Sequence, residues 1–184
     1  MTLQSHHKTA FWLVVSVGLL SSLIPGGPVE NRDFSHIHPA ILGAFNIFLT
    51  VLDLGSLVLA FFAARQRRLA LKLAFAAAIA FFGVYAIDLA QIFPRSPTPM
   101  SFALALIEVL GMTAAIPLMF VSRRALAELG ISSKGSATSY VRYPMLAALF
   151  VIGGVVVWYA TAAAMGSDVI GAVEAASPLR MSAH

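Results

Sequence analysis

Cysteine is absent from this chain of 184 residues. Its absence excludes disulfides, catalysis by a thiolate, and zinc or iron–sulfur sites with cysteine ligands. Any chemistry in this protein must therefore use carboxylates, imidazoles, hydroxyls or amides.

Charged residues are also scarce. Asp, Glu, Lys and Arg make up 11% of the chain and apolar residues make up 59%, whereas a soluble domain is about a quarter charged and about half apolar. The chain has too little polar surface to fold in water, and a lipid bilayer would cover its apolar exterior instead. The composition predicts one integral membrane domain, residues 1–184, a multi-pass protein of the cell membrane (the inner membrane where there are two).

Several motifs are missing as well. All five histidines lie outside the apolar runs, which excludes a transmembrane haem held by two histidines. No run carries the arginines of a voltage sensor, and no phosphate-binding glycine loop, G-x-S-x-G turn or H-E-x-x-H helix occurs. The net charge of +4 is spread over short loops rather than gathered in a patch, which argues against a nucleic-acid partner.

What the chain does have is long apolar runs. A membrane-spanning helix needs about 20 mostly apolar residues, and lipid requires every backbone polar group to be bonded within the segment. The sequence therefore predicts an all-α bundle of about five transmembrane helices, with residues 167–184 as a flexible tail. The predicted helices cover about residues 10–24, 39–64, 69–93, 100–121 and 144–166.

The first apolar run has a second interpretation. Lys8 precedes an apolar stretch of the length found in signal peptides. No A-x-A-like cleavage site follows, because the chain continues Ile24-Pro25-Gly26-Gly27-Pro28. The sequence favours a retained helix, and cleavage would leave four helices in the same orientation.

The basic residues predict the orientation. Short cytoplasmic loops are enriched in Lys and Arg. Three of the twelve basic residues, Arg32, Arg95 and Arg180, fall on one side of the predicted spans, and the other nine fall on the opposite side. The N-terminus is therefore predicted inside and the C-terminus outside. The nine are Lys8, Arg65, Arg67, Arg68, Lys72, Arg123, Arg124, Lys134 and Arg142. The loop at about residues 125–143 is predicted to be solvated and flexible.

Three carboxylates, Asp53, Asp88 and Glu108, fall inside the apolar runs. Each costs about 2.5–3.5 kcal/mol on insertion scales, so each needs a role. At about 1.5 Å per residue, Asn46, Asp88 and Glu108 lie about 8–12 Å below the outer end of their helices, and Asp53 lies about 20 Å down. These depths predict a polar cluster in the outer half of the bundle, with Asp53 nearer the midplane.

Helical spacing adds neighbours to the acids. Asn46, Thr50 and Asp53 share one face of the second helix, and Tyr85, Asp88 and Gln91 form a looser stripe on the third. Above them lies the most polar stretch of the chain, residues 30–38. Its Glu30, Arg32 and Asp33 are predicted to contact a ligand, and Asp33 or Ser35 is predicted to cap the second helix.

His36 and His38 form an H-x-H pair in that stretch. Two such imidazoles in an extended segment point the same way and could share one divalent metal, with Asp88 or Glu108 as a further ligand. The cofactor is otherwise unknown. The alternative to metal binding is that the two histidines are simply polar residues at the membrane interface.

These residues lead to three hypotheses for function. The first is an outer-half pocket that binds a lipid-soluble small molecule or a cation, for sensing, transport or an accessory role. The second is a membrane enzyme in which Asp53, Asp88 and Glu108 supply acid/base chemistry on a lipid or isoprenoid. The third is a structural subunit of a larger membrane complex. In that case Asp88 and Glu108 would only join helices, or pair with Arg32 and Arg95 from the loops.

Overall fold

The computed structural model describes residues 4–24, 29–30, 32–131 and 143–164, and every regular element in these ranges is an α-helix. Helices α2 (Pro39–Ala64), α3 (Arg68–Leu89) and α4 (Phe102–Ile131) are long and apolar enough to cross a membrane. Two further helices lie in the described ranges, α1 (Ser5–Ser21) and α5 (Tyr143–Ala164). The all-helical prediction is therefore confirmed for the described residues.

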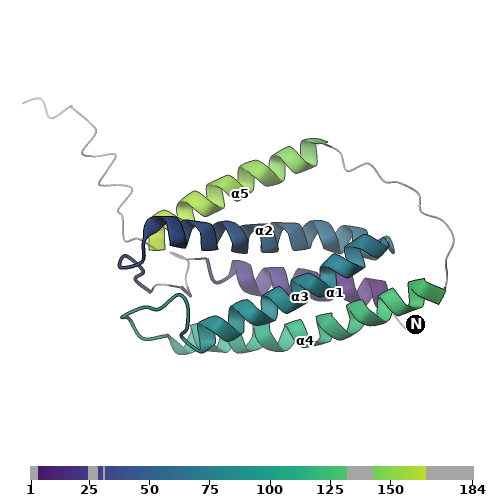
Figure 1. The fold of residues 1–184 in the computed structure, drawn as a ribbon, viewed down its shortest axis with the longest axis horizontal. Coiled ribbons are helices and arrows are strands. Elements are labelled where there is room, and N and C mark those ends of the chain that lie inside the picture. The colour runs from purple at the N-terminus through teal and green to yellow at the C-terminus, as the bar shows by residue number, and fades with distance from the viewer. Residues whose placement is uncertain (1–3, 25–28, 31, 132–142, 165–184) are drawn as a thin grey trace, which may run out of the picture.

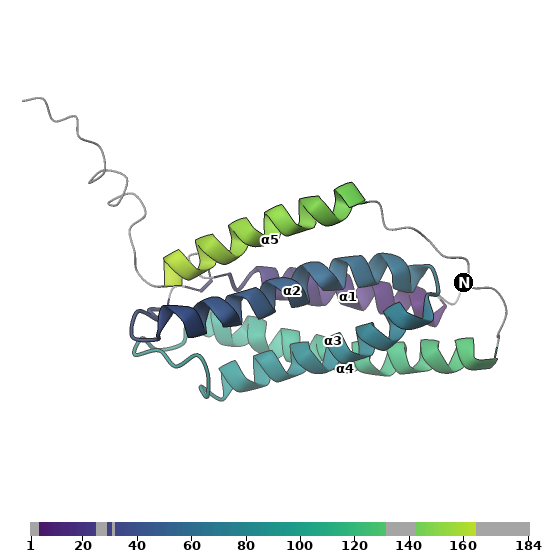
Figure 2. The same cartoon turned by 45° about the horizontal axis from the view of Figure 1, so that its top comes forward.

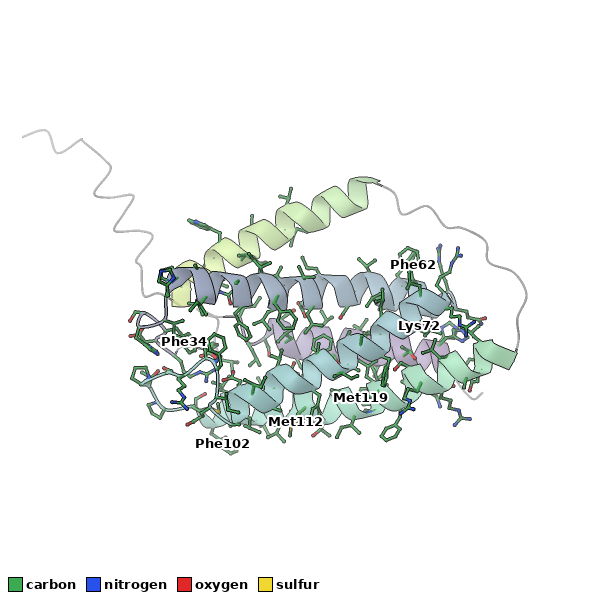
Figure 3. The ribbon with its side chains drawn as sticks, in the orientation of Figure 1. Phe34, Phe62, Lys72, Phe102, Met112 and Met119 are labelled. Atoms are coloured by element: carbon green, nitrogen blue, oxygen red, sulfur yellow. The ribbon has the colours of Figure 1, made fainter. Side chains whose placement is uncertain are left out.

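Successive helices run antiparallel to one another along the long axis of the bundle (Figure 1). As a result, the start of α1, the α2–α3 turn and the end of α4 lie at one end of the bundle. The α1–α2 and α3–α4 connections lie at the other. Figure 3 shows Lys72 and Phe62 at the first end and Phe34 and Phe102 at the second.

The core lies among α1, α3 and α4. Leu13 of α1, Phe81 of α3 and Leu118 of α4 are fully buried. Both α3 and α4 carry small buried side chains, and small residues let helices approach closely in membrane bundles. These small side chains are Ala74, Ala77, Ala78, Ala114 and Ala115.

Helix α5 lies along the α2 side of the bundle (Figure 2). Its Gly153 is buried against α2, where an added Cβ would lie 3.3 Å from Leu54 and 3.4 Å from Thr50. The sequence pair Gly153-Gly154 predicts such a close approach, and the structure shows that Gly153 is the residue that makes it. Beyond the backbone of its own helix and its chain neighbours, the described residues place no atom within 4 Å of a Cβ built on Gly154.

The helix ends differ from the expected ones where polar side chains find partners. Helix α1 begins at Ser5, not near residue 10, and the Ser5 hydroxyl donates to Glu128 of α4 at 2.7 Å. Helix α4 runs on to Ile131, so the prediction of a flexible loop from about residue 125 is wrong for its first part. Hydropathy falls at Arg123, but the Arg124–Glu128 pair continues the helix. The rest of that loop and the tail 167–184 lie outside the described residues.

Helix α2 begins and ends where the sequence places it. The prediction that Asp33 or Ser35 caps it is wrong, because His38 takes this position. The His38 Nδ1 accepts a hydrogen bond from the Ala40 amide at 3.2 Å, and Pro39 occupies the first turn. Helix α3 ends at Leu89, four residues early, because the backbone turns at Gln91, which has a φ of 53°.

Candidate functional site

Arg32 crosses from the α1–α2 connection to α3. Its Nη1 donates to Asp88 Oδ1 at 2.9 Å and its Nη2 donates to Asp88 Oδ2 at 2.8 Å. This is the bidentate geometry typical of a guanidinium paired with a carboxylate. Its Nε donates to Glu30 Oε1 at 2.9 Å. Only 4% of the Arg32 side chain is exposed. This buried ion cluster ties the connection to the helix bundle.

The guanidinium stays charged in this setting. Burial by itself lowers the pKa of Arg32, but the hydrogen bonds to Glu30 and Asp88 outweigh it and hold the pKa above its ordinary value. Phe34 packs beside the guanidinium, which lies 5.2 Å from the ring centre. Phe34 itself is 2% exposed and contacts Leu42 of α2. The connection is thus anchored by an ion pair and by an apolar contact.

Glu108 of α4 lies beside this cluster and is fully buried. Its Oε1 is 3.9 Å from Arg32 Nη2, the same atom that donates to Asp88 Oδ2. Within the described part of the chain, neither oxygen makes a hydrogen bond of acceptable geometry. Three carboxyl groups therefore share one guanidinium, so the cluster has an excess of acidic groups.

A cavity of about 190 Å³ lies beneath the ion cluster. Residues of α1, α2, α3, α5 and the α1–α2 connection form its wall, and most of them are aliphatic or aromatic. Eight polar residues also line it: Ser21, Glu30, Arg32, Asn46, Thr50, Asp53, Tyr85 and Asp88. The cavity therefore runs from the ion cluster at one end of α2 to Asp53 in the middle of that helix.

Asp53 and Tyr85 carry polar atoms that the described residues leave unbonded. Ser21 donates a hydrogen bond to Asp53 Oδ2 at 2.6 Å, while Asp53 Oδ1 has no partner there. Tyr85 is 1% exposed and its hydroxyl is also without a partner within those residues. Buried polar groups are normally hydrogen-bonded, so two such groups in one cavity suggest a missing partner.

Gly111 of α4 decides where Tyr85 lies. A Cβ added to Gly111 would fall 2.3 Å from Tyr85 Cζ, so the tyrosine ring occupies the space that any other residue would fill. The ring thereby packs directly against α4 at Gly111, and Tyr85 lines the same cavity as Asp53. A glycine in an apolar run is thus part of the site.

The structure brings together most of the residues that the sequence predicts for the site. Asn46, Thr50 and Asp53 line the cavity from one face of α2, as their spacing predicts. From the remaining predicted residues, Tyr85, Asp88, Glu30 and Arg32 line it too, and Glu108 lies behind the ion cluster. Four predicted residues are exposed and do not line the cavity: Asp33, His36, His38 and Gln91.

Asp33 has a structural role in the described loop. Its Oδ1 accepts a hydrogen bond from the Ser35 amide at 2.8 Å, and this bond holds the pKa of Asp33 below its ordinary value. Its backbone oxygen accepts from the Ser96 hydroxyl at 2.9 Å and its amide donates to Thr98 at 3.2 Å. Asp33 therefore joins the two connections at this end of the bundle.

The described residues do not bring a set of metal ligands together. Across the described ranges, no group of three His, Asp or Glu side chains is placed to hold a metal ion. Asp88 is bound by Arg32, and His38 caps α2. A metal shared by His36 and His38 stays a prediction.

Sequence reasoning missed Ser21, Phe45, Pro94, Val156 and Ala160 as cavity residues. Only Ser21 carries a usable signal, because a serine near the C-terminal end of an apolar run needs a hydrogen-bond partner. The others are apolar residues among many, and hydropathy does not separate those that line a cavity from those that face lipid.

The comparisons give one family and no activity. The model of the family described as "Domain of unknown function (DUF8051)" matches residues 5–140, which include α1 to α4 and every polar residue of the cavity. No curated protein and no solved structure matches the chain.

Proposed function

The chain belongs to this family of unknown function, and from that premise we propose that it is a membrane protein of five spanning helices whose outer-half cavity binds a small molecule. Three helices have the length and composition for crossing a membrane. Helices α1 and α5 pack against these helices and also run lengthwise along the bundle (Figure 1). Buried α1 residues such as Leu13 and Thr9 make α1 part of the bundle's core, which supports a retained first helix.

The charge distribution over the two ends supports an N-terminus in the cytoplasm. Arg32 and Arg95 lie at the end formed by the α1–α2 and α3–α4 connections. A larger set of described basic residues gathers toward the opposite end, which the bias of Lys and Arg toward the cytoplasm puts inside. This set consists of Lys8, Arg65, Arg67, Arg68, Lys72, Arg123 and Arg124.

Thiol labelling tests this orientation without background, because the chain has no cysteine. Ser35 and Arg68 are both exposed and lie at opposite ends. With an impermeant thiol reagent on intact cells, Ser35→Cys is expected to be labelled and Arg68→Cys is expected to react only after the cells are opened. The reverse pattern would overturn the orientation.

The cavity is the observation that carries the binding function. It combines an apolar wall with unbonded polar atoms of Asp53 and Tyr85, which is the usual make-up of a small-molecule site. A lipid-soluble molecule with a polar head, or a cation, fits this combination. Binding of such a molecule would serve sensing, transport or an accessory role in a membrane complex.

Amide variants test the binding function. The compound that co-purifies with the detergent-solubilised wild-type protein is identified by mass spectrometry, and its retention is compared in Asp53→Asn, Asp88→Asn and Glu108→Gln. Each change keeps the shape of the side chain but removes its charge. Asp53→Asn is expected to lose the compound while its thermal stability stays near that of the wild type, because Ser21 still has an acceptor oxygen to bind.

Asp33→Asn is the matched control, because Asp33 is an exposed aspartate outside the cavity. It is expected to retain the compound fully. If all three buried-acid variants retained as much compound as the wild type, the binding function would be abandoned in favour of the structural subunit.

A membrane enzyme is the second candidate, and the position of the Asp88 and Glu108 carboxyls around one atom, Arg32 Nη2, favours it. Two carboxyls in one buried site can act as proton donor and acceptor for a lipid or isoprenoid substrate. Turnover that depends on pH and is lost in Glu108→Gln would support the enzyme. Retention of an unchanged compound would support binding alone.

A further inference from the structure

We propose that the ligand of this cavity is a small organic ammonium ion, a protonated amine on a compact apolar body, whose nitrogen lies between Asp53 and Tyr85. This inference rests on the proposed binding function and specifies its ligand. It follows from the charge of the cavity wall, from the two unbonded acceptor atoms and from the volume.

The charge of the wall favours a cation. Glu30, Asp53 and Asp88 line the cavity, and Arg32 is the one basic residue among the described lining residues. The donors of Arg32 are directed to Glu30 and Asp88, so this side chain is neutralised and not available to an anionic head group. Asp53 lies apart from that cluster and its described partner is the neutral Ser21. A cation would balance the Asp53 charge.

The unbonded atoms favour a donor of several hydrogen bonds. Ser21 donates to Asp53 Oδ2, and Oδ1 of this cavity-lining residue has no partner among the described residues. The Tyr85 hydroxyl is a second such atom, on a side chain that is 1% exposed and held in place by Gly111. An ammonium group carries three N–H donors, enough to serve both oxygens. These two buried oxygens without a described partner are therefore evidence for a ligand in addition to the acidic residues of the wall.

An inorganic cation fits less well. Calcium takes six to eight oxygen ligands and magnesium demands near-octahedral coordination, and no metal-binding group occurs among the described His, Asp and Glu residues. Apolar residues next to Asp53 or Ser21 in the sequence also line the wall, among them Leu20, Leu49 and Leu54. Such a wall suits the carbon skeleton of an organic cation.

The volume limits the skeleton. The cavity holds about 190 Å³, below the ~300–1,000 Å³ of pockets for drug-sized ligands, and an apolar cavity of ~150 Å³ accommodates benzene. The site therefore fits one aromatic ring with a short aminoalkyl chain. It is too small for a whole phospholipid.

Three probes that share one skeleton test the inference: 2-phenylethylamine, 2-phenylethanol and 3-phenylpropanoate. Their binding to the full chain in detergent is measured by equilibrium dialysis at a pH where the amine is protonated. Because a hydrogen bond to a charged group contributes more than one between neutral groups, the amine is expected to bind at least about tenfold more tightly than the alcohol. The carboxylate is expected to bind weakest.

Variants then locate the nitrogen. Asp53→Asn is expected to remove the preference for the amine while the alcohol binds as before, and Tyr85→Phe is expected to reduce that preference. Asp33→Asn, the exposed control, is expected to keep it. These readouts compare two probes on one protein, so they stay interpretable if a variant is produced in low yield.

The outcomes separate this inference from the proposed function. Equal binding of amine and alcohol to the wild type, or tighter binding of the carboxylate, would overturn the ammonium site and leave a small-molecule cavity. A preference for the amine that persists in Asp53→Asn would place the cation elsewhere and overturn it as well. Saturable binding of none of the three probes would count against both.

Discussion

Replacing Arg32 by leucine is expected to destabilise the bundle by about 3–5 kcal/mol, the usual cost of removing one partner from a buried ion pair. Leucine would leave Glu30 and Asp88 buried without their cation, and Glu108 without the guanidinium 3.9 Å away. Equilibrium unfolding in mixed micelles, followed by circular dichroism, measures the loss.

Three further variants test the cause of this loss. Arg95→Leu removes an exposed arginine at the same end and is expected to change stability little. Arg32→Lys keeps the charge but cannot form the bidentate hydrogen bonds to Asp88. Its stability is therefore expected to lie between those of the wild type and Arg32→Leu. Adding Asp88→Leu to Arg32→Leu should recover part of the loss, because it removes one unpaired acid. An Arg32→Leu protein as stable as the wild type would contradict the buried ion cluster.

Gly111→Ala is expected to destabilise the bundle by about 1–3 kcal/mol, the usual cost of overpacking a core. The new Cβ would lie 2.3–2.7 Å from three atoms of the Tyr85 ring, which must move. The Tyr85 hydroxyl would move with the ring, so binding of 2-phenylethylamine is expected to weaken in the same variant. Unfolding and equilibrium dialysis measure the two effects on one preparation.

Gly83→Ala in α3 is the matched control, since no side chain or neighbouring helix in the described part of the chain lies within 4 Å of its added Cβ. It is expected to be neutral or to stabilise the helix by up to about 1 kcal/mol. Adding Tyr85→Leu to Gly111→Ala is expected to restore part of the stability but not the binding of the amine. Unchanged stability and unchanged binding in Gly111→Ala would show that Tyr85 is not held by this glycine.

The sequence predicts the residues of the site better than their contacts. Spacing on α2 places Asn46, Thr50 and Asp53 on one face, and all three line the cavity. Helical periodicity is a local property, so it is readable without a fold. Glu108 and Asp88 are expected at one depth for the same reason, and the structure places both carboxyls within 4 Å of Arg32 Nη2.

Exposed residues show where this reasoning fails. Asp33, His36 and His38 are polar residues in a polar stretch, and the sequence contains no sign that they are exposed and do not line the cavity. Asp33 instead bonds Ser35, Ser96 and Thr98. Those partners include residues more than sixty positions away, and only the packing of the two connections brings them close.

The sequence by itself determined the apolar helices, the end at which the basic residues gather, and the acids that need a partner, because hydropathy and periodicity are properties of single segments. The tertiary structure alone decided three things. Arg32 pairs with Asp88, 56 residues away; Ser21 bonds Asp53; and Tyr85 fits over Gly111. These contacts depend on how neighbouring helices are rotated and how far apart they lie, which is set by the interlocking of many side chains at once.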